Sequence, residues 1–461
     1  MLSEQLWIRL QPYMKTEWRQ CMDEGLSVEK FEIVCSKLEE AQNGREEEAG
    51  RIALEMQSCP VRPGYAYKEP SGLTAIKAAS SHVFPVFGKV HDIDSLREKI
   101  NGAWTGRIVG CLLGKPVEGM YREKLWPMLR ETGNFPMHKY MEKKDFTDEL
   151  IKGLELNLNR CWRDTVGEII PPDDDTNYTV FAMKLLETYG PNFTSEDVME
   201  GWLRWLPMLA TCTAERAAYR NAGTGILPPE TATYRNPFRE WIGAQIRGDF
   251  FGYINPGNPE SAAESAYRDA SVSHVKNGIY GEMWVAAMLA AAAVCGDVTD
   301  VIQAGLAVVP AMSRLSEDVR AVMDWHSSGV PADEAIERVH AKYNEYLEHD
   351  WCKTCPNAMI VTLGLLYANG DFGRGICLAV QAAFDTDCNG ATVGSVLGMM
   401  LGRSGISPGW AFTDKLQTSI EGYNIVTVSA LTDKTMKMIE MISDLGCITT
   451  KNNHVSGNID L

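Results

Sequence analysis

The sequence predicts an all-α protein, and three observations support this. Apolar residues recur at helical spacing through most of the chain, strand-like alternation is rare, and two apolar segments carry a glycine at every fourth position. A glycine inside a helix costs about 1 kcal/mol relative to alanine. We therefore expect two buried helices whose bare stripes pack closely together or against common neighbours. The glycines are Gly106, Gly110 and Gly114, then Gly390, Gly394, Gly398 and Gly402.

Length and charge limit the possible classes of protein. The chain has 461 residues, 45% of them hydrophobic, enough for two or three domains or for one large helical domain with an added piece. The 44 Lys and Arg against 61 Asp and Glu give a net charge of −17, which argues against wrapping nucleic acid or coating an anionic membrane. We therefore expect neither a nucleic-acid nor a membrane partner.

The cysteines and the chain start predict a cytoplasmic protein. Twelve cysteines without regular short spacing are typical of reduced thiols, and the single Cys352 to Cys355 motif is interpreted as structural. The first residues lack a basic region followed by an apolar one, so no signal peptide is predicted. The longest apolar run, 283–295, is too short to cross a bilayer.

Two regions are predicted from the first hundred residues. Charged amphipathic helices reach residue 60, and Pro- and Gly-rich turn signals follow up to about 93. We predict an N-terminal helical extension over 1–93 and a main domain over 94–461. Ser95 and Glu98 form a capping-box pattern, which predicts the start of the first glycine-striped helix; Pro116 ends that helix.

The remaining elements follow from local periodicity and turn residues. Short helices and loops are expected over 121–170, a helix from about 176 to 189, and another over 195–209. The segment 218–282 is rich in Gly, Pro and Arg, which predicts a long, loop-dense and therefore functional interval. An Ala-rich helix is expected over 282–295 and helices with short connections over 297–384. A last helix is expected over 433–445, before a frayed polar tail ending at 461.

Two acidic groups stand at the starts of apolar helices. Asp173, Asp174 and Asp175 follow two prolines, and Asp385 and Asp387 open the second glycine-striped helix. Each group could simply cap its helix or lie solvated on the surface, because Asp is a common N-cap residue. If the groups instead converge, so many buried carboxylates require cations. Oxygen ligands alone favour Mg²⁺, Mn²⁺ or Ca²⁺ over Zn²⁺.

The order of three motifs resembles the ADP-ribosylglycohydrolase family, in the manner of the dinitrogenase reductase-activating glycohydrolases. The motifs are the striped helix ending in 116–119, the acidic run 173–176, and the segment 385–391, and the resemblance covers roughly 97–412. It implies an orthogonal, multi-helix all-α fold with a dinuclear magnesium or manganese centre. It also implies hydrolysis of the glycosidic bond between ADP-ribose and a protein side chain or small leaving group.

The resemblance assigns the site residue by residue. Asp174 and Asp175 match the adjacent metal-binding aspartates of the family, Asp385 and Asp387 match its C-terminal pair, and Glu118 matches an acidic residue beside the substrate. Asp173 and Cys388 stand where the family usually has threonine, and both join the predicted metal set. Cys388 replaces a hard hydroxyl with a soft thiol, which could shift the metal preference. Glu118, Asp175 and Asp387 are the predicted catalytic residues. In the alternative interpretation Glu118 only pairs with a nearby Lys or Arg.

A stretch before the Ala-rich helix resembles the part of the family that lines the nucleotide pocket. Tyr280 could stack on a base, and glycines permit close approach to a phosphate. His274 is alternatively a hydrogen-bonded core residue. Arg220 and Arg235 could clamp phosphate or be solvated on the surface. The predicted substrate-binding residues are Ser273, His274, Gly278, Tyr280 and Gly281.

The predicted function is a hydrolase that uses two divalent cations, Mg²⁺ or Mn²⁺, to cleave an N- or O-glycosidic bond to ribose. Its partner would be a small ribosyl or ADP-ribosyl compound, or an ADP-ribosylated protein. Two metals can hold a ribose diol and activate water between them. The alternatives are a non-catalytic protein that binds ADP-ribose-like nucleotides, and a hydrolase of an unrelated sugar conjugate.

Overall fold

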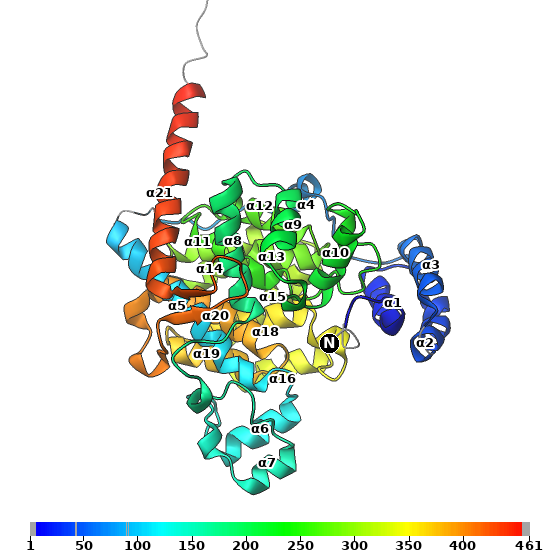
Figure 1. Ribbon diagram of the computed structural model, residues 1–461, viewed down its shortest axis with the longest axis horizontal. Coiled ribbons are helices and arrows are strands. Elements are labelled where there is room, and N and C mark those ends of the chain that lie inside the picture. Colours follow the sequence, from blue (N-terminus) through cyan, green and yellow to red (C-terminus); the bar gives the residue numbers. More distant parts are fainter. Residues whose placement is uncertain (1–5, 42–43, 89, 91, 454–461) are drawn as a thin grey trace, which may run out of the picture.

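The predicted all-α fold is confirmed. The structure, a computed structural model, describes residues 6–41, 44–88, 90 and 92–453, with side chains up to residue 442. Within these residues helices dominate, and the only sheet is an antiparallel pair of short strands, β1 (Lys415–Gln417) and β2 (Ile425–Thr427) (Figure 1). None of the described helices combines the length and apolar character that a bilayer crossing requires.

The helices vary from a single turn to seven turns. The most extensive contact between two helices is that of α5 with α20, and this pair also contacts α8, α13, α18, α19 and α21 (Figure 1). Their bounds are α1 (Met14–Asp23), α2 (Glu32–Glu40), α3 (Glu46–Gln57), α4 (Leu73–Ala79), α5 (Ile93–Gly114), α6 (Arg122–Glu131), α7 (Asp148–Leu154), α8 (Asp174–Tyr189), α9 (Ser195–Trp205), α10 (Thr213–Gly223), α11 (Asp249–Tyr253), α12 (Pro259–Ala270), α13 (Asn277–Ala292), α14 (Val298–Ala307), α15 (Arg314–Ser327), α16 (Ala332–Lys342), α17 (Glu348–Trp351), α18 (Thr354–Leu366), α19 (Phe372–Gln381), α20 (Thr386–Leu401) and α21 (Val428–Asn453).

The two glycine stripes face each other, as predicted. A Cβ added to Gly106 would lie 2.0 Å from the carbonyl oxygen of Gly394, and one added to Gly110 would lie 1.9 Å from that of Gly390. These pairings make α5 and α20 antiparallel, with backbone against backbone. Gly402 differs from the prediction because it ends α20 in a left-handed conformation, with φ of 72°, instead of extending the stripe.

The predicted capping box at Ser95 is wrong. Helix α5 begins two residues earlier, at Ile93, where the Asp92 carboxylate accepts the Asp94 backbone N–H at 3.0 Å. Asp92 supplies the same kind of oxygen that Ser95 would have supplied, and so it caps the helix first.

The predicted loop-dense interval is also partly wrong, because it contains the end of α10, the whole of α11 and α12, and the start of α13. Helix α12 begins with Pro259 directly after its cap Asn258, whose side chain accepts the Ser261 N–H at 3.2 Å. Proline in the first helical position is a start signal, and a count of Gly and Pro alone overlooks it. At the other end of the chain, the predicted helix 433–445 lies inside α21, and the predicted tail over 454–461 lies outside the described residues.

The N-terminal helices have a small core of their own but are bound to the main body by buried charges. Buried apolar side chains between Leu10 and Met56 form one cluster, whereas Ile76 of α4 belongs to the large core. Arg239 of the main body donates to Glu17 of α1 and to Glu24, the residue that follows α1, at 2.7 Å each. The division into 1–93 and 94–461 stays a prediction.

We expect Glu17→Gln to lower the free energy of unfolding by about 2 kcal/mol, because it weakens a hydrogen bond to a charged group inside the protein. Glu17 is fully buried and Arg239 is 3% exposed. Urea denaturation measures the change, with the exposed Glu32→Gln of α2 as the matched control. Equal stability of the two variants would show that this contact does not bind the N-terminal helices to the body.

Candidate active site

The acidic segments converge where α5, α8 and α20 meet. Asp173 caps α8, its carboxylate accepting the Asp175 N–H at 3.0 Å. Ligand atoms of Asp175, Asp387 and Cys388 lie within 4.8 Å of one another, and those of Cys111, Asp173 and Asp175 do the same. All five side chains are buried. Residues more than 200 positions apart in the sequence therefore form one cluster with two overlapping groups.

The remaining predicted acids belong to the same cluster. Burial and then the charge of Asp173 raise the pKa of Asp174, and burial and then the charge of Asp387 raise the pKa of Asp385. The pKa of Asp175 is likewise raised, chiefly by burial, although Arg107 opposes the shift. Such shifts mean that the carboxyls would hold protons unless a cation compensates their charge.

Lys115 lies among three of these carboxylates. It begins the short 3₁₀ turn η4 (Lys115–Val117) after α5, and its Nζ is 2.5 Å from Asp173 Oδ2, 3.2 Å from Glu118 Oε2 and 3.4 Å from Asp387 Oδ2. Burial disfavours the ammonium, but the three carboxylates outweigh it and raise the pKa of Lys115. Pairing of Glu118 with a lysine, the alternative from the sequence, is therefore present in the structure.

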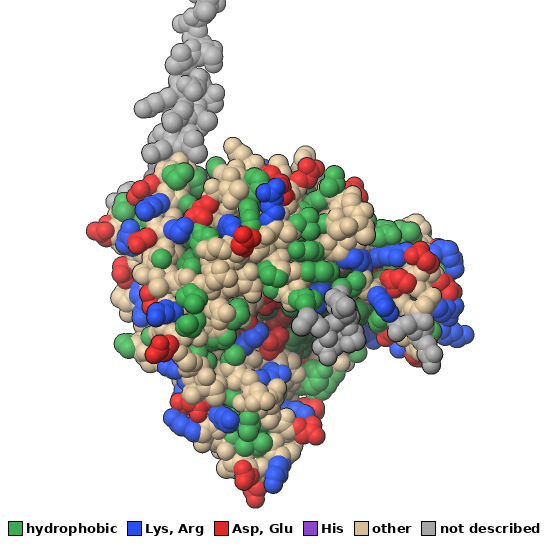
Figure 2. Space-filling view, viewed as in Figure 1, with side chains coloured by type: hydrophobic (Ala, Val, Ile, Leu, Met, Phe, Trp, Pro, Cys, Tyr) green, Lys and Arg blue, Asp and Glu red, His purple; other side chains and the backbone are tan. Residues whose placement is uncertain are grey.

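Glu118 occupies the loop at the mouth of the site. The charge of Asp387, then burial, raises the pKa of Glu118 to about 7, although Lys115 opposes the shift. Its backbone carbonyl accepts a hydrogen bond from the Arg160 guanidinium. Arg160, Lys143 and Pro171 line a neighbouring pocket of about 490 Å³. Pro171 is two residues before Asp173 in the sequence. Figure 2 shows acidic and basic side chains together in a hollow between the body and the lobe that contains α6 and α7.

Arg107 of α5 orients the Asp175 carboxylate. Its fully buried guanidinium donates to Asp175 Oδ1 at 2.7 Å, to Asp249 Oδ2 at 3.1 Å and to the Ile246 carbonyl at 2.7 Å. The buried guanidinium of Arg107 therefore fixes the position of Asp175 Oδ1. Sequence reasoning missed Arg107, although a charged residue between Gly106 and Ile108 in an apolar helix is a signal for a buried ion pair.

The cluster fits a divalent cation. Asp175 Oδ2 and Asp387 Oδ1 are buried and have no hydrogen-bond partner within the described part of the chain. Unpartnered buried carboxylate oxygens are costly, and a cation is the partner that such oxygens accept. The thiol of Cys111, a residue that sequence reasoning missed, is a further possible ligand because it follows the stripe glycine Gly110 and faces Asp173 and Asp175.

Ser273 and His274 lie in a different polar cluster. Arg247 donates to Ser273 Oγ at 3.0 Å, and Ser273 Oγ is 2.8 Å from His274 Nδ1. Burial, and then Arg247, lower the pKa of His274, so its ring is neutral. The contacts of His274 match the alternative of a hydrogen-bonded core residue, and the substrate-binding role of the pair stays a prediction.

Gly278, Tyr280 and Gly281 make packing contacts at the start of α13. The Tyr280 hydroxyl donates to the Pro70 carbonyl, and its ring is fully buried. A Cβ added to Gly278 would lie 2.7 Å from the Arg239 carbonyl oxygen, and one added to Gly281 would lie 2.6 Å from the Thr354 side chain. Close helix packing accounts for both glycines, and contact with substrate stays a prediction.

The two arginines considered for phosphate binding contact the N-terminal region. Arg220 donates to the Ile8 carbonyl, and Arg235 donates to Glu47 at 3.0 Å. Neither is simply solvated, because Arg220 binds the segment before the N-terminal helices and Arg235 binds α3. Cys352 and Cys355 are both buried, and Cys352 Sγ lies 4.0 Å from Asp385 Oδ2.

Comparison with known families decides the family. A family model described as ADP-ribosylglycohydrolase matches residues 92–439. The chain belongs to the ADP-ribosylglycohydrolase family. One similar solved structure, titled "ADP-ribosylglycohydrolase-related protein complex", has 17% sequence identity and a TM-score of 0.43 over 76% of this chain and 99% of its own. No curated protein matches the chain.

The ADP-ribosylglycohydrolase match includes every segment of the acidic cluster. Residues 111–118, 173–175 and 385–388 all lie within 92–439, whereas α1 to α3 lie outside it. The family consists of glycosidic-bond hydrolases that generally use divalent metals, which agrees with the unpartnered oxygens of Asp175 and Asp387.

Proposed function

We propose that the chain is a divalent-metal-dependent hydrolase that cleaves an N- or O-glycosidic bond to ribose, in an ADP-ribosyl adduct or in a smaller ribosyl compound such as a nucleoside. The observation that carries the proposal is the group of Asp175, Asp387 and Cys388, with two unpartnered buried oxygens at its centre. Family membership supports the class of bond, and the pocket lined by Arg160, which binds the Glu118 carbonyl, supports the substrate's position.

The metal-holding role falls to the inner carboxylates. Asp174, Asp175, Asp385 and Asp387 would hold the cations, with Arg107 fixing the direction of Asp175. When bound, divalent ions polarise ribose hydroxyls and lower the pKa of a water molecule. Asp173 has a different role from these ligands, because one of its carboxylate oxygens accepts the Asp175 N–H and the other pairs with Lys115. Asp173 thus keeps the Lys115 ammonium beside Asp387.

Glu118 is the proposed base. Cleavage at a ribosyl carbon develops oxocarbenium character, so the enzyme must place an activated water molecule opposite the leaving group. The Glu118 carboxylate lies at the cluster's mouth, its side chain 41% exposed, where it can take a proton from water. Lys115 Nζ, at 3.2 Å from Glu118 Oε2, holds the carboxylate in place. Arg160 and Lys143 line the adjoining pocket and supply positive charge suited to a substrate phosphate.

We expect kcat/KM to rise with pH through the Glu118 titration. The folded-state pKa of Glu118 is raised to about 7, so the base is protonated and inactive below that pH and ionised above it. A cation beside Asp387 would cancel part of the charge that raises this pKa, so saturating metal should move the rise to lower pH. Glu118→Gln should lose the rise, and pH–rate profiles at two metal concentrations measure it. An unchanged profile in Glu118→Gln would exclude Glu118 as the base.

The proposal is tested by incubating the full chain with ADP-ribosylated peptides, nucleosides and sugar phosphates, each with Mg²⁺, Mn²⁺ or Zn²⁺ after chelation. We expect free ADP-ribose or ribose from a ribosyl compound, metal dependence, and no product from Asp387→Ala. The exposed Asp333→Ala is the matched control and should keep full activity. Thermal stabilisation by ADP-ribose without turnover of any compound would instead identify a nucleotide-binding protein.

A further inference from the structure

Besides Cys352, which lies beside Asp385, two cysteine thiols lie against the acidic cluster, one from each of the paired helices. Cys111 of α5 is 3% exposed and Cys388 of α20 is 6% exposed. Each thiol belongs to a separate group of three possible ligands, Cys111 with Asp173 and Asp175, and Cys388 with Asp175 and Asp387. Asp175 is common to the two groups, so each sulfur lies within 4.8 Å of a carboxylate oxygen of Asp175.

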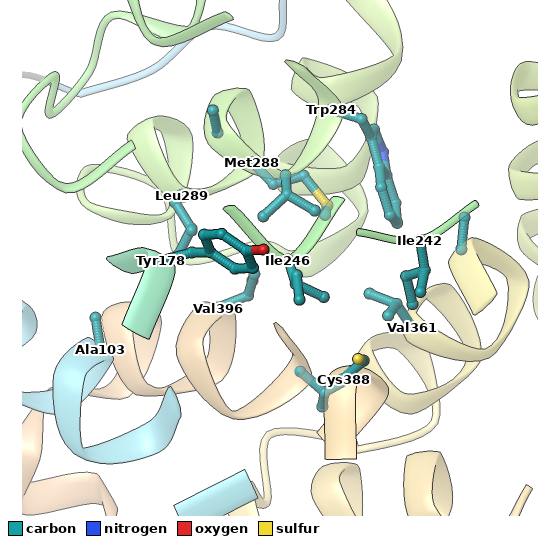
Figure 3. Close-up of a cluster of buried hydrophobic side chains, with 14 of the residues drawn as sticks. Ala103, Tyr178, Ile242, Ile246, Trp284, Met288, Leu289, Val361, Cys388 and Val396 are labelled. Atoms are coloured by element: carbon teal, nitrogen blue, oxygen red, sulfur yellow. The ribbon is translucent and has the colours of Figure 1, made fainter. Parts of the chain in front are cut away.

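The glycine stripes place the two sulfurs. Cys111 follows Gly110, and Cys388 precedes Gly390 by two residues, at the point where the two backbones are in direct contact. Figure 3 shows Cys388 at the edge of the cluster of buried apolar side chains that includes Ile246 and Val361. Both thiols are buried on helices that are in direct backbone contact, so neither can move away from the acidic cluster without loss of packing.

The donor set determines which ions the site prefers. Mg²⁺ takes oxygen ligands almost exclusively, whereas thiolates select softer ions such as Zn²⁺ and its substitute Co²⁺. We propose that Cys111 and Cys388 are metal ligands and that this centre binds Zn²⁺ and Co²⁺ in preference to Mg²⁺. This proposal rests on the proposed function for the location of the metal centre at Asp175 and Asp387. It differs in the ion that we expect to bind there.

Lys115 makes the additional negative charge of thiolate ligands acceptable. Its ammonium contacts Asp173 Oδ2 and Asp387 Oδ2, whereas Asp387 Oδ1 and Asp175 Oδ2 have no hydrogen-bond partner among the described residues. The lysine thus neutralises part of the charge of the cluster and leaves the unpartnered oxygens of Asp175 and Asp387 for the ion.

The test is optical and does not depend on activity. The full-length protein, with metal removed and thiols kept reduced, is titrated with Co²⁺, and thiolate-to-cobalt charge-transfer absorption is recorded. We expect this absorption in the wild type, about half of it in Cys111→Ser and in Cys388→Ser, and none in the double variant. Calorimetry should show that the double variant loses about tenfold or more of its preference for Zn²⁺ over Mg²⁺. Cys59→Ser, at a partly exposed position two residues beyond the end of α3, is the matched control.

The wild-type spectrum decides the proposal even if a variant fails to fold. Bound Co²⁺ without charge-transfer absorption would overturn it, as would equal Zn²⁺ preference in the wild type and the double variant. If ADP-ribose is then still released with Mg²⁺, the proposed function stands and only the thiol ligands are excluded. Conversely, charge-transfer absorption in a protein that hydrolyses no ribosyl compound would support the metal site and contradict the hydrolase.

Discussion

Replacement of Gly110 by alanine is expected to lower the free energy of unfolding by about 5 kcal/mol or more, or to prevent folding. The new Cβ would lie 1.9 Å from the Gly390 carbonyl oxygen and 2.9 Å from the Ala391 nitrogen. Both are backbone atoms inside α20, so no side-chain rotation can relieve the overlap. The helices would have to separate along the line on which the acidic cluster is built. Overpacking of this kind belongs to the largest single-residue effects.

A second glycine provides the matched control. Gly153 lies inside α7, and a Cβ added there would meet no atom within 4 Å. Gly153→Ala should therefore stabilise the protein by about 0.5–1 kcal/mol through helix propensity and a less flexible unfolded chain. Chemical denaturation of the two variants measures the contrast. If Gly110→Ala unfolds at nearly the same denaturant concentration as Gly153→Ala, the helices are not held together by backbone contact.

Local sequence signals were sufficient for the central part of the fold. A glycine at every fourth position defines one side of a helix whatever the partner, so the close packing of Gly106 and Gly110 could be predicted before the partner was known. Starts and ends were less predictable. Asp92 and Ser95 are both good caps, and the choice between them depends on which one the chain geometry reaches first. The same limitation applies to α12, where Pro259 begins a helix within a segment of loop-like composition.

The acidic residues of the site could be predicted from the sequence, but the basic residues that pair with them could not. Asp175 and Asp387 stand at helix starts that the sequence marks directly. Lys115 and Arg107, by contrast, act through partners far along the chain, and their pairing with Asp173, Asp387 and Asp249 depends on tertiary structure alone. The substrate residues could not be located for the same reason. Ser273 lies in a segment whose composition is typical of a binding loop, but its Oγ accepts a hydrogen bond from the buried guanidinium of Arg247.

Arg107→Met is expected to lower the free energy of unfolding by about 3–5 kcal/mol at pH 7, because it leaves two buried carboxylates without their cation. Asp175 and Asp249 are fully buried, and both lie within 3.1 Å of the guanidinium. The exposed Arg51→Met, which removes only a surface pair with Glu55, is the matched control and should change stability by less than about 0.5 kcal/mol.

The pH dependence of that loss distinguishes lost charge from lost packing. Burial already raises the pKa of Asp249 while Arg107 opposes the shift, so removal of Arg107 should raise this pKa further. A carboxyl with a raised folded-state pKa binds more protons in the folded than in the unfolded state, so its folded form is favoured at low pH and weakens as pH rises. The stability difference between the wild type and Arg107→Met should therefore widen as pH rises from about 4 to 7. Adding Asp249→Leu to Arg107→Met should recover part of the loss, since one unpaired charge is then removed. A deficit that is constant with pH and unaffected by Asp249→Leu would mean that Arg107 stabilises α5 through packing alone.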